Sequence, residues 1–205
     1  MNSSRSKAVF LDRDGVINRK APEGEYIKTW REIQFLPGAV KAVRALNCAG
    51  YKVFVATNQR GVATLKVKIN DLLEIHERIQ CEFARDGAII SQIYYCPHDI
   101  ASQCPCRKPQ PGMLRRAADE HNLDLRASWM VGDAVTDVKA GENAGCRSIL
   151  LASVIPSLSG LSSLPFVTES LESAVPLMLN GHRPQNRLLR TQRLELSRSS
   201  SCENL

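Results

Sequence analysis

Aromatic residues are scarce in this chain, and long apolar runs are missing from it. Only 5% of the 205 residues are aromatic and two are tryptophan, whereas 43% are hydrophobic. No apolar run approaches the roughly 20 residues that span a membrane. This composition is typical of a soluble protein that mixes helices and strands.

A secretory signal is also missing. Residues 1–7 are polar and lead directly into the first apolar segment, so we expect a cytoplasmic protein. Seven cysteines in such a protein are not expected to form disulfides. Cys48, Cys81 and Cys146 lie in helical or strand-flanking segments, where we expect small core residues.

The body of the chain has little excess charge. The net charge is +6, but the five Arg and two Glu after residue 180 contribute +3, and Arg5 and Lys7 contribute two more. A near-neutral body and a tail without interleaved aromatics argue against the alternative class, a nucleic-acid-binding protein. We therefore expect one domain over residues 1–180, a monomer, followed by a basic, disordered tail over residues 181–205.

Strand-like and helix-like patterns alternate along residues 1–180. Apolar runs predict strands over residues 8–11, 51–56, 89–95, 129–133 and 147–152. Apolar residues at helical spacing predict a helix that Pro37-Gly38 opens and Gly50 stops, and further helices over residues 69–85, 112–121, 136–143 and 169–179. Such βαβ units imply a parallel α/β sheet with right-handed crossovers.

The first strand runs straight into acidic residues. Ala8 to Leu11 are apolar, and Asp12, Asp14 and Gly15 follow. Unpaired charges cannot be buried in a core, so both acids must lie where the chain leaves the sheet, at the edge where ligands bind. One carboxylate there can attack phosphorus and the other can move the proton. An ordinary polar turn is the alternative, and this stretch alone does not separate the two.

Two other predicted strands also end in polar residues. Thr57 and Asn58 follow the second strand, where a hydroxyl and backbone amides can bind phosphate. Asp133 ends the fourth strand, and Asp137 follows at the start of a helix. Asp12, Asp133 and a phosphate would satisfy Mg²⁺. For Asp137 a helix N-terminal role is an equally good interpretation.

Four soft ligands gather in residues 96–106, which we call the zinc loop. Cys96, His98, Cys104 and Cys106 offer three thiolates and one imidazole. This is a complete tetrahedral set that leaves no position open for water, so it indicates structural rather than catalytic zinc. Arg107 and Lys108 follow at once, and they are either anion-binding residues or solvated loop charges.

Taken together, these motifs resemble, in order, the four motifs of the haloacid-dehalogenase-like phosphatases. They are Asp12 to Val16, Thr57 to Gln59, Arg107 to Pro109, and Gly132-Asp133 with Asp137. The zinc loop is similar to that of the branch containing histidinol-phosphate and heptose-bisphosphate phosphatases, which has no large cap domain. The resemblance covers about residues 7–155 and implies a Rossmann-like three-layer α/β/α sheet with a zinc-stapled loop.

The resemblance also implies roles for single residues. Asp12 would be the nucleophile and a Mg²⁺ ligand, and Asp14 the general acid and base, with its backbone carbonyl on the metal. Thr57 and Lys108 would hold the transferring phosphoryl group. Asp133 would be the remaining protein ligand of Mg²⁺, with Asp137 as outer support.

Substrate contacts are expected from further residues near these motifs. Arg107 would recognise a distal, non-reacting phosphate. The other expected contacts are Asn58, Gln59, Arg60 and Lys20. The chain departs from the family's pattern at Arg60, where relatives have a small residue, and at Ala134, where many have a basic one. These departures affect specificity more than the core chemistry.

The expected activity is therefore Mg²⁺-dependent removal of phosphate from a sugar bisphosphate through an aspartyl-phosphate. Residues Tyr26-Ile27, Phe35 to Gly38 and Lys108 to Gly112 resemble the heptose-bisphosphate phosphatases of this branch more closely. This resemblance implies the 7-phosphate of a heptose 1,7-bisphosphate as substrate, with histidinol phosphate as the alternative. A catalytically dead scaffold is disfavoured because both acids are present.

Overall fold

A computed structural model describes residues 5–180 of the chain. Residues 1–4 and 181–205 lie outside the described residues, and with them lie Cys202 and the predicted basic tail. The prediction of a domain over 1–180 and a disordered tail therefore stays a prediction.

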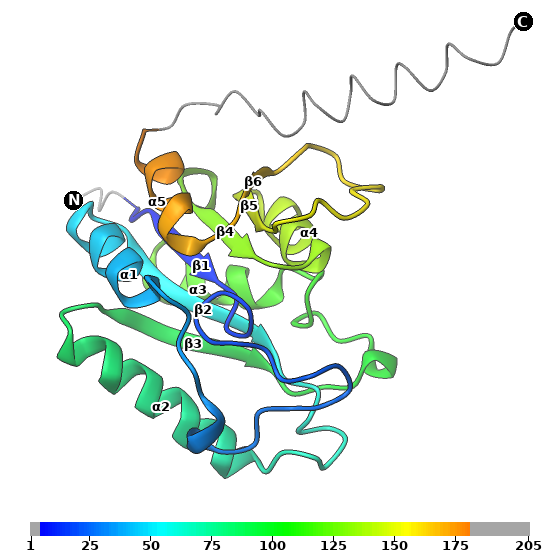
Figure 1. Ribbon diagram of the computed structural model, residues 1–205. Coiled ribbons are helices and arrows are strands. Elements are labelled where there is room, and N and C mark those ends of the chain that lie inside the picture. Colours follow the sequence, from blue (N-terminus) through cyan, green and yellow to red (C-terminus); the bar gives the residue numbers. More distant parts are fainter. Residues whose placement is uncertain (1–4, 181–205) are drawn as a thin grey trace, which may run out of the picture.

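Six parallel strands form one sheet in the order β3-β2-β1-β4-β5-β6 (Figure 1). The strands are β1 (Ala8–Leu11), β2 (Lys52–Asn58), β3 (Ile90–Cys96), β4 (Trp129–Gly132), β5 (Arg147–Leu151) and β6 (Phe166–Thr168). The chain order reverses on either side of β1, because β2 lies on one side of it and β4 on the other. Ligands bind at such a switch point in open parallel sheets.

Five α-helices cover the two faces of this sheet. They are α1 (Ala39–Cys48), α2 (Ile69–Arg85), α3 (Gly112–His121), α4 (Val135–Ala144) and α5 (Leu171–Asn180). Three short 3₁₀ helices lie in the connections: η1 (Trp30–Glu32), η2 (Ile100–Ser102) and η3 (Leu125–Ala127). One core cluster contains the apolar faces of α1, α2 and α5, and another contains that of α3. The predicted three-layer α/β/α architecture is confirmed.

Strand β1 lies at the centre because all four of its side chains are apolar. Val9 and Leu11 belong to the core cluster of α1, α2 and α5, and Ala8 and Phe10 to that of α3. Each of these side chains is completely buried. Successive side chains point to opposite faces of a strand, so a run of four apolar residues suits a strand covered on both faces.

The structure corrects three predictions made from the sequence. It adds β6, which the sequence pattern did not reveal, because three residues are too few to show an alternation. Cys48 and Cys81 were expected in the core, but both are exposed. They lie on the outer sides of α1 and α2, whereas Cys146, before β5, is buried as expected.

No large cap domain is present within residues 5–180, as expected. The segment between β1 and α1 contains only the short helix η1 and runs beside the carboxyl ends of the strands (Figure 1). Among the helices of the described part, none is long and apolar enough to cross a membrane.

Candidate active site

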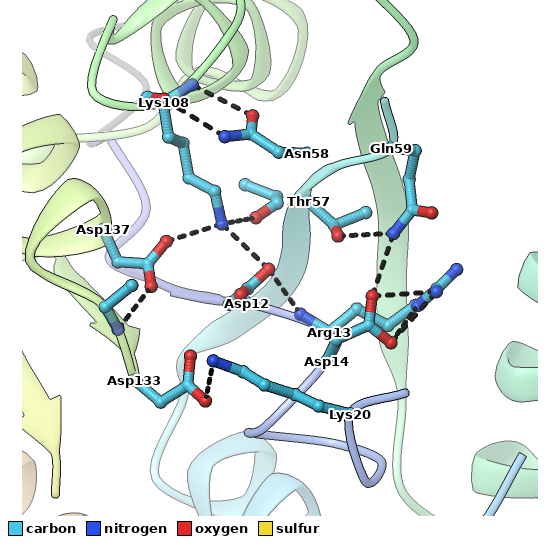
Figure 2. Close-up of polar contacts among 12 residues, drawn as sticks. Asp12, Arg13, Asp14, Lys20, Thr57, Asn58, Gln59, Lys108, Asp133 and Asp137 are labelled. Carbon is cyan, nitrogen blue, oxygen red and sulfur yellow. Dashed lines mark hydrogen bonds and ion pairs between the residues drawn. The ribbon is translucent and has the colours of Figure 1, made fainter. Parts of the chain in front are cut away.

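Asp12 lies directly after β1, where the chain leaves the sheet. Its backbone amide still donates to the carbonyl of Val131 on β4, at 2.9 Å, so the strand pairing extends up to this residue. Its Oδ1 accepts from the backbone amide of Arg13, at 2.8 Å, and from Lys108 Nζ, also at 2.8 Å. Two donors on one oxygen fix the direction of the carboxylate (Figure 2).

Lys108 reaches this site from the far end of the zinc loop. Its ammonium lies 2.8 Å from Asp12 Oδ1, 2.6 Å from Asp137 Oδ1 and 2.7 Å from the carbonyl oxygen of Ala56. These three acceptors match the three N–H donors of an ammonium group. The side chain is almost fully buried, so the two carboxylates are its counter-ions. The interpretation of Lys108 as a solvated loop charge is wrong.

The segment after β4, which includes the first turn of α4, supplies two more carboxylates. Asp133 Oδ2 lies 2.6 Å from Lys20 Nζ. Asp137 Oδ2 accepts from the backbone amide of Ala134, at 3.0 Å, at the start of α4, while its Oδ1 binds Lys108. Asp137 therefore stabilises the helix N-terminus and neutralises Lys108 at the same time.

Two glycines allow these groups to come together. Gly15 has a φ of +93°, and a Cβ on it would collide with the carboxylate of Asp133. A Cβ on Gly132 would collide with the carboxylate of Asp137. Any larger residue at either position would displace a carboxylate of the site.

Burial and mutual repulsion change the acidity of these groups. Burial raises the pKa of Asp12 to about 6, against the lowering effect of Lys108, and Asp137 raises it further. Burial also raises the pKa of Asp133, and Lys20 opposes this effect. Burial alone would lower the pKa of Lys108, but Asp12 and Asp137 raise it above its ordinary value. Such strongly perturbed groups in one place are typical of a functional site.

Asp12, Asp133 and Asp137 form a group that we call the carboxylate cluster, and it fits a hard cation. One oxygen from each residue lies within 4.8 Å of the others. Within the described residues 5–180, no donor reaches the buried Oδ1 of Asp133. An orphaned buried carboxylate oxygen next to two other carboxylates suits Mg²⁺, which takes oxygen ligands.

Asp14 points away from the carboxylate cluster (Figure 2). Arg13 donates to both of its oxygens, with three N–O distances of 2.8–3.1 Å. Asn18 Nδ2 adds a bond to Oδ1 at 2.8 Å, and Gln59 Nε2 adds one to Oδ2 at 3.1 Å. The carboxylate is thus held from three directions.

Residues at the end of β2 contact both Lys108 and Asp14. The buried Thr57 accepts from Gln59 Nε2 through its hydroxyl oxygen, at 2.9 Å, which leaves the hydroxyl proton to donate. The amide of Asn58 binds both the backbone N–H of Lys108, at 3.0 Å, and its carbonyl, at 3.1 Å. Asn58 and Gln59 thus position Lys108 and Asp14, and direct contact of either with substrate stays a prediction.

The zinc loop brings its four expected ligands together. The Sγ atoms of Cys96 and Cys104 are 3.5 Å apart, and those of Cys104 and Cys106 are 3.4 Å apart. His98 Nδ1 lies 3.6 Å from Cys96 Sγ and 3.2 Å from Cys106 Sγ. A zinc tetrahedron with ordinary bond lengths has edges of roughly 3.5–3.8 Å. The donor set and its spacing therefore fit tetrahedral zinc.

The two expected substrate arginines both contact the zinc loop. Arg60 Nε lies 3.0 Å from Asp99 Oδ2. Arg107 Nη1 lies 3.5 Å from the carbonyl oxygen of His98. A cavity of about 280 Å³ lies between Asp14 and the segment of residues 20–27, with Asn58 and Gln59 in its wall. Neither arginine lines it, so their contact with substrate stays a prediction.

Sequence reasoning missed three residues that organise the site. Arg13, Asn18 and the buried His76 of α2 lie in the network behind Asp14. The sequence offered one indication for Arg13, because a cation between two acids can form an ion pair with either of them. His76 had none, since its contact with Arg13 crosses 63 residues of chain.

The chain has clear relatives. A family model for HAD-like hydrolases matches residues 105–162. The chain is 37% identical over 169 residues to D-glycero-alpha-D-manno-heptose-1,7-bisphosphate 7-phosphatase of Mycobacterium bovis, covering 80% of this chain and 86% of that protein. It is 41% identical over 145 residues to the corresponding beta-heptose enzyme of Pseudomonas putida, covering 71% and 82%.

Solved structures agree with this likeness. The D,D-heptose 1,7-bisphosphate phosphatase of B. bronchiseptica, complexed with magnesium and phosphate, superimposes with a TM-score of 0.77. It is 32% identical, and the match covers 86% of this chain and 99% of that one. The enzyme of Burkholderia thailandensis has a TM-score of 0.62 at 28% identity, covering 84% and 98%.

Proposed function

The chain belongs to the HAD-like hydrolases, in the family of the D-glycero-D-manno-heptose-1,7-bisphosphate 7-phosphatases, and we propose that it removes the 7-phosphate of such a heptose bisphosphate. The observation that supports this most directly is the arrangement around Asp12. A buried carboxylate, fixed by Lys108 and the amide of Arg13, lies beside two further carboxylates that can hold a cation.

Asp12 has the properties of a nucleophile for phosphorus. Its raised pKa, about 6, leaves it largely ionised at neutral pH and makes it more basic than an ordinary aspartate. One carboxylate oxygen attacks the phosphorus, the bond from phosphorus to the sugar oxygen breaks, and an aspartyl-phosphate forms. Lys108 stays against Asp12 throughout and offsets negative charge on the transferring group.

Asp14 moves the protons of both half-reactions. It donates a proton to the sugar oxygen that leaves, and it then takes a proton from the water that attacks the aspartyl-phosphate. Phosphate and free Asp12 result. The Thr57 hydroxyl and the neighbouring backbone amides bind the phosphoryl oxygens.

Two metals fit this protein, in different places. Asp12 and Asp133, with the backbone carbonyl of Asp14, would hold Mg²⁺, which lowers the charge repulsion of phosphoryl transfer. The four ligands of the zinc loop would hold a structural zinc, which fixes the backbone just before Arg107 and Lys108.

Arg107 provides the test that separates a bisphosphate from other substrates. Binding energy from a remote phosphate can orient the reacting one. Arg107→Ala should lower kcat/KM for heptose 1,7-bisphosphate by about 10- to 150-fold, since a charge-assisted bond contributes about 1.5–3 kcal/mol. The loss on p-nitrophenyl phosphate, which has no second phosphate, should be much smaller.

The assay uses both anomers of the heptose bisphosphate, histidinol phosphate and p-nitrophenyl phosphate, with ³¹P NMR to identify the remaining phosphate. Arg115→Ala is the matched control, because Arg115 also donates to a backbone carbonyl, that of Asn143, but in a different part of the molecule. Equal losses on mono- and bisphosphate in Arg107→Ala would remove the residue-level support for a bisphosphate. Release of the 1-phosphate would contradict the proposed position of cleavage.

A further inference from the structure

Asp14 depends on Arg13 for most of its hydrogen bonds. Arg13 Nε and Nη2 donate to Oδ1 at 3.1 and 3.0 Å, and Nη2 also donates to Oδ2 at 2.8 Å. The side chain of Arg13 is only 1% exposed. Whatever holds this guanidinium therefore also sets the direction of the Asp14 carboxylate.

The other end of the guanidinium contacts His76. Arg13 Nη1 lies 3.3 Å from His76 Nε2, in a buried contact. Arginine has only donors, so Nε2 must be the acceptor, and the imidazole must be neutral with its proton on Nδ1. A buried guanidinium N–H without an acceptor would be costly, and His76 supplies that acceptor.

The surroundings of His76 keep it in this neutral form. The residue lies on the buried side of α2, and its ring packs against that of Tyr95 on β3, with centroids 5.5 Å apart. Burial lowers the pKa of His76 to about 3, the charge of Arg13 lowers it further, and Asp14 opposes this. The acceptor is thus present throughout the neutral pH range.

We propose that His76 is a positioning residue of the phosphatase, which acts through Arg13 to fix the position of the Asp14 carboxylate. The inference rests on the proposed function of Asp14 as general acid and base. A carboxylate, a buried guanidinium and a neutral imidazole form a chain in which Asp14 is the member that moves protons. Loss of the imidazole frees one end of Arg13, and the Asp14 carboxylate is then held firmly only by Asn18 and Gln59.

The test replaces His76 in two ways. His76→Leu removes the acceptor at similar size, whereas His76→Gln offers an amide oxygen in its place. For heptose 1,7-bisphosphate, whose sugar oxygen needs a proton to leave, His76→Leu should lower kcat about 10-fold or more, since general acid–base catalysis contributes about 10²–10⁴-fold. KM should change little, and His76→Gln should recover most of the rate.

Pre-steady-state kinetics with p-nitrophenyl phosphate provide the readout that a structural defect would not give. Nitrophenolate leaves without a proton, so the aspartyl-phosphate should still form at the wild-type rate in His76→Leu. Its hydrolysis needs Asp14 as base and should be slow. The expected result is a burst of about one nitrophenolate per active site, followed by slow turnover.

His121→Leu is the matched control, because His121 also bonds a side-chain oxygen, that of Gln92 at 3.0 Å, and packs against an aromatic ring, that of Phe54. It should keep the wild-type rates. If His76→Leu does not fold, His76→Gln against the shorter His76→Asn makes the same comparison. Equal loss of burst and steady-state rates, unchanged kcat, or no recovery in His76→Gln would overturn the inference.

If the proposed function is wrong, the wild-type assay shows it, and not the comparison of His76 variants. The wild-type protein would then not release phosphate from the heptose bisphosphate. The p-nitrophenyl phosphate experiment compares the variants with the wild type on an artificial substrate, so it still tests the position of His76 in that case.

Discussion

The carboxylate cluster and the zinc loop are both groups of potential metal ligands, but they are assembled in different ways. The carboxylate cluster comes from the ends of β1 and β4, two neighbouring strands separated by much of the sequence, and from the first turn of α4. The zinc loop is one short segment that leaves β3. The first exists because the sheet forms, whereas the second has all its ligands within eleven residues whatever the sheet does.

The two groups also differ in what stabilises them without a metal. The carboxylate cluster is balanced by Lys108 and Lys20, and the strands beneath it are buried. In the zinc loop, Cys104 and Cys106 are only half-buried, and its one helix, η2, has no buried residue. We therefore expect substitutions in the carboxylate cluster to affect chemistry and substitutions in the zinc loop to affect local folding.

The largest effect is expected for Asp12→Asn. This change removes the nucleophile and keeps the volume, so phosphatase turnover should be lost while the circular dichroism spectrum stays that of the wild type. Steady-state phosphate release is the measurement, with the exposed Asp119→Asn as control. Near-normal turnover in Asp12→Asn would rule out an aspartyl-phosphate.

Asp14→Asn should have the next largest effect. Proton transfer to the leaving oxygen and from the attacking water would both suffer, with a loss of about 10²–10⁴-fold in kcat. Rates for phosphate esters with leaving groups of increasing pKa measure this directly. A loss that does not grow as the leaving group becomes poorer would contradict an acid role for Asp14.

Cys104→Ser tests the zinc loop through its metal content, whereas the substitutions in the carboxylate cluster test chemistry. The purified wild-type protein should contain one zinc per chain by elemental analysis, and the variant should contain much less. Activity should fall as a secondary effect, because Lys108 follows the last ligand closely. Cys81→Ser, at an exposed cysteine of α2, is the control and should keep both zinc and activity. Full zinc content in a Cys96→Ser, Cys104→Ser double variant would disprove the site.

Lys108→Met measures how much the carboxylate cluster relies on its internal cation. Removing one partner of a buried ion pair costs about 3–5 kcal/mol, because the remaining charges stay buried. Urea unfolding should show this loss without Mg²⁺, and saturating Mg²⁺ should reduce it, since the metal supplies the missing positive charge. Lys41→Met, which breaks the exposed pair with Glu172, is the control. A similar small loss in both variants would mean that Lys108 does not neutralise the cluster.

The smallest expected effect concerns His76 and the loss of unfolding free energy at acid pH. The pKa of His76 is about 3 in the fold, because of burial and Arg13, but about 6.5 when unfolded. Between these two pKa values the unfolded chain binds a proton that the folded chain does not. The contribution of His76 to the free energy of unfolding is therefore fully present above pH 6.5 and is lost as the pH falls toward 3.

Replacing His76 with Gln removes this proton linkage. Between pH 7 and pH 4.5, His76→Gln should lose roughly 2 kcal/mol less unfolding free energy than the wild type. Asp14 and the Tyr95 ring also face this histidine, and they are unchanged in the variant. Parallel stability curves for the two proteins would show that His76 is not buried in neutral form.

Much of the site was predictable because a single physical rule places it. Charged residues cannot end up inside a buried strand, so Asp12 and Asp133 had to lie at the edge of the sheet. The same rule did not predict the role of Asn58. We expected it to bind substrate, but its side-chain amide bonds both the backbone N–H and the carbonyl of Lys108. Contacts of this kind form only where two loops meet in space, so no local sequence pattern predicts them.

The sequence alone determined the parallel α/β architecture and the grouping of four potential metal ligands in the zinc loop. Apolar runs and helical spacing are local properties, and Cys96 to Cys106 lie within one segment. Only the tertiary structure decided which charges meet: Lys108 with Asp12 and Asp137, and Arg13 with Asp14 and His76. The reason is that the sheet order places β2 and β4 on either side of β1, and with them the loops that deliver these side chains. Buried charges are stable only with partners, and the fold selects which partners are within reach.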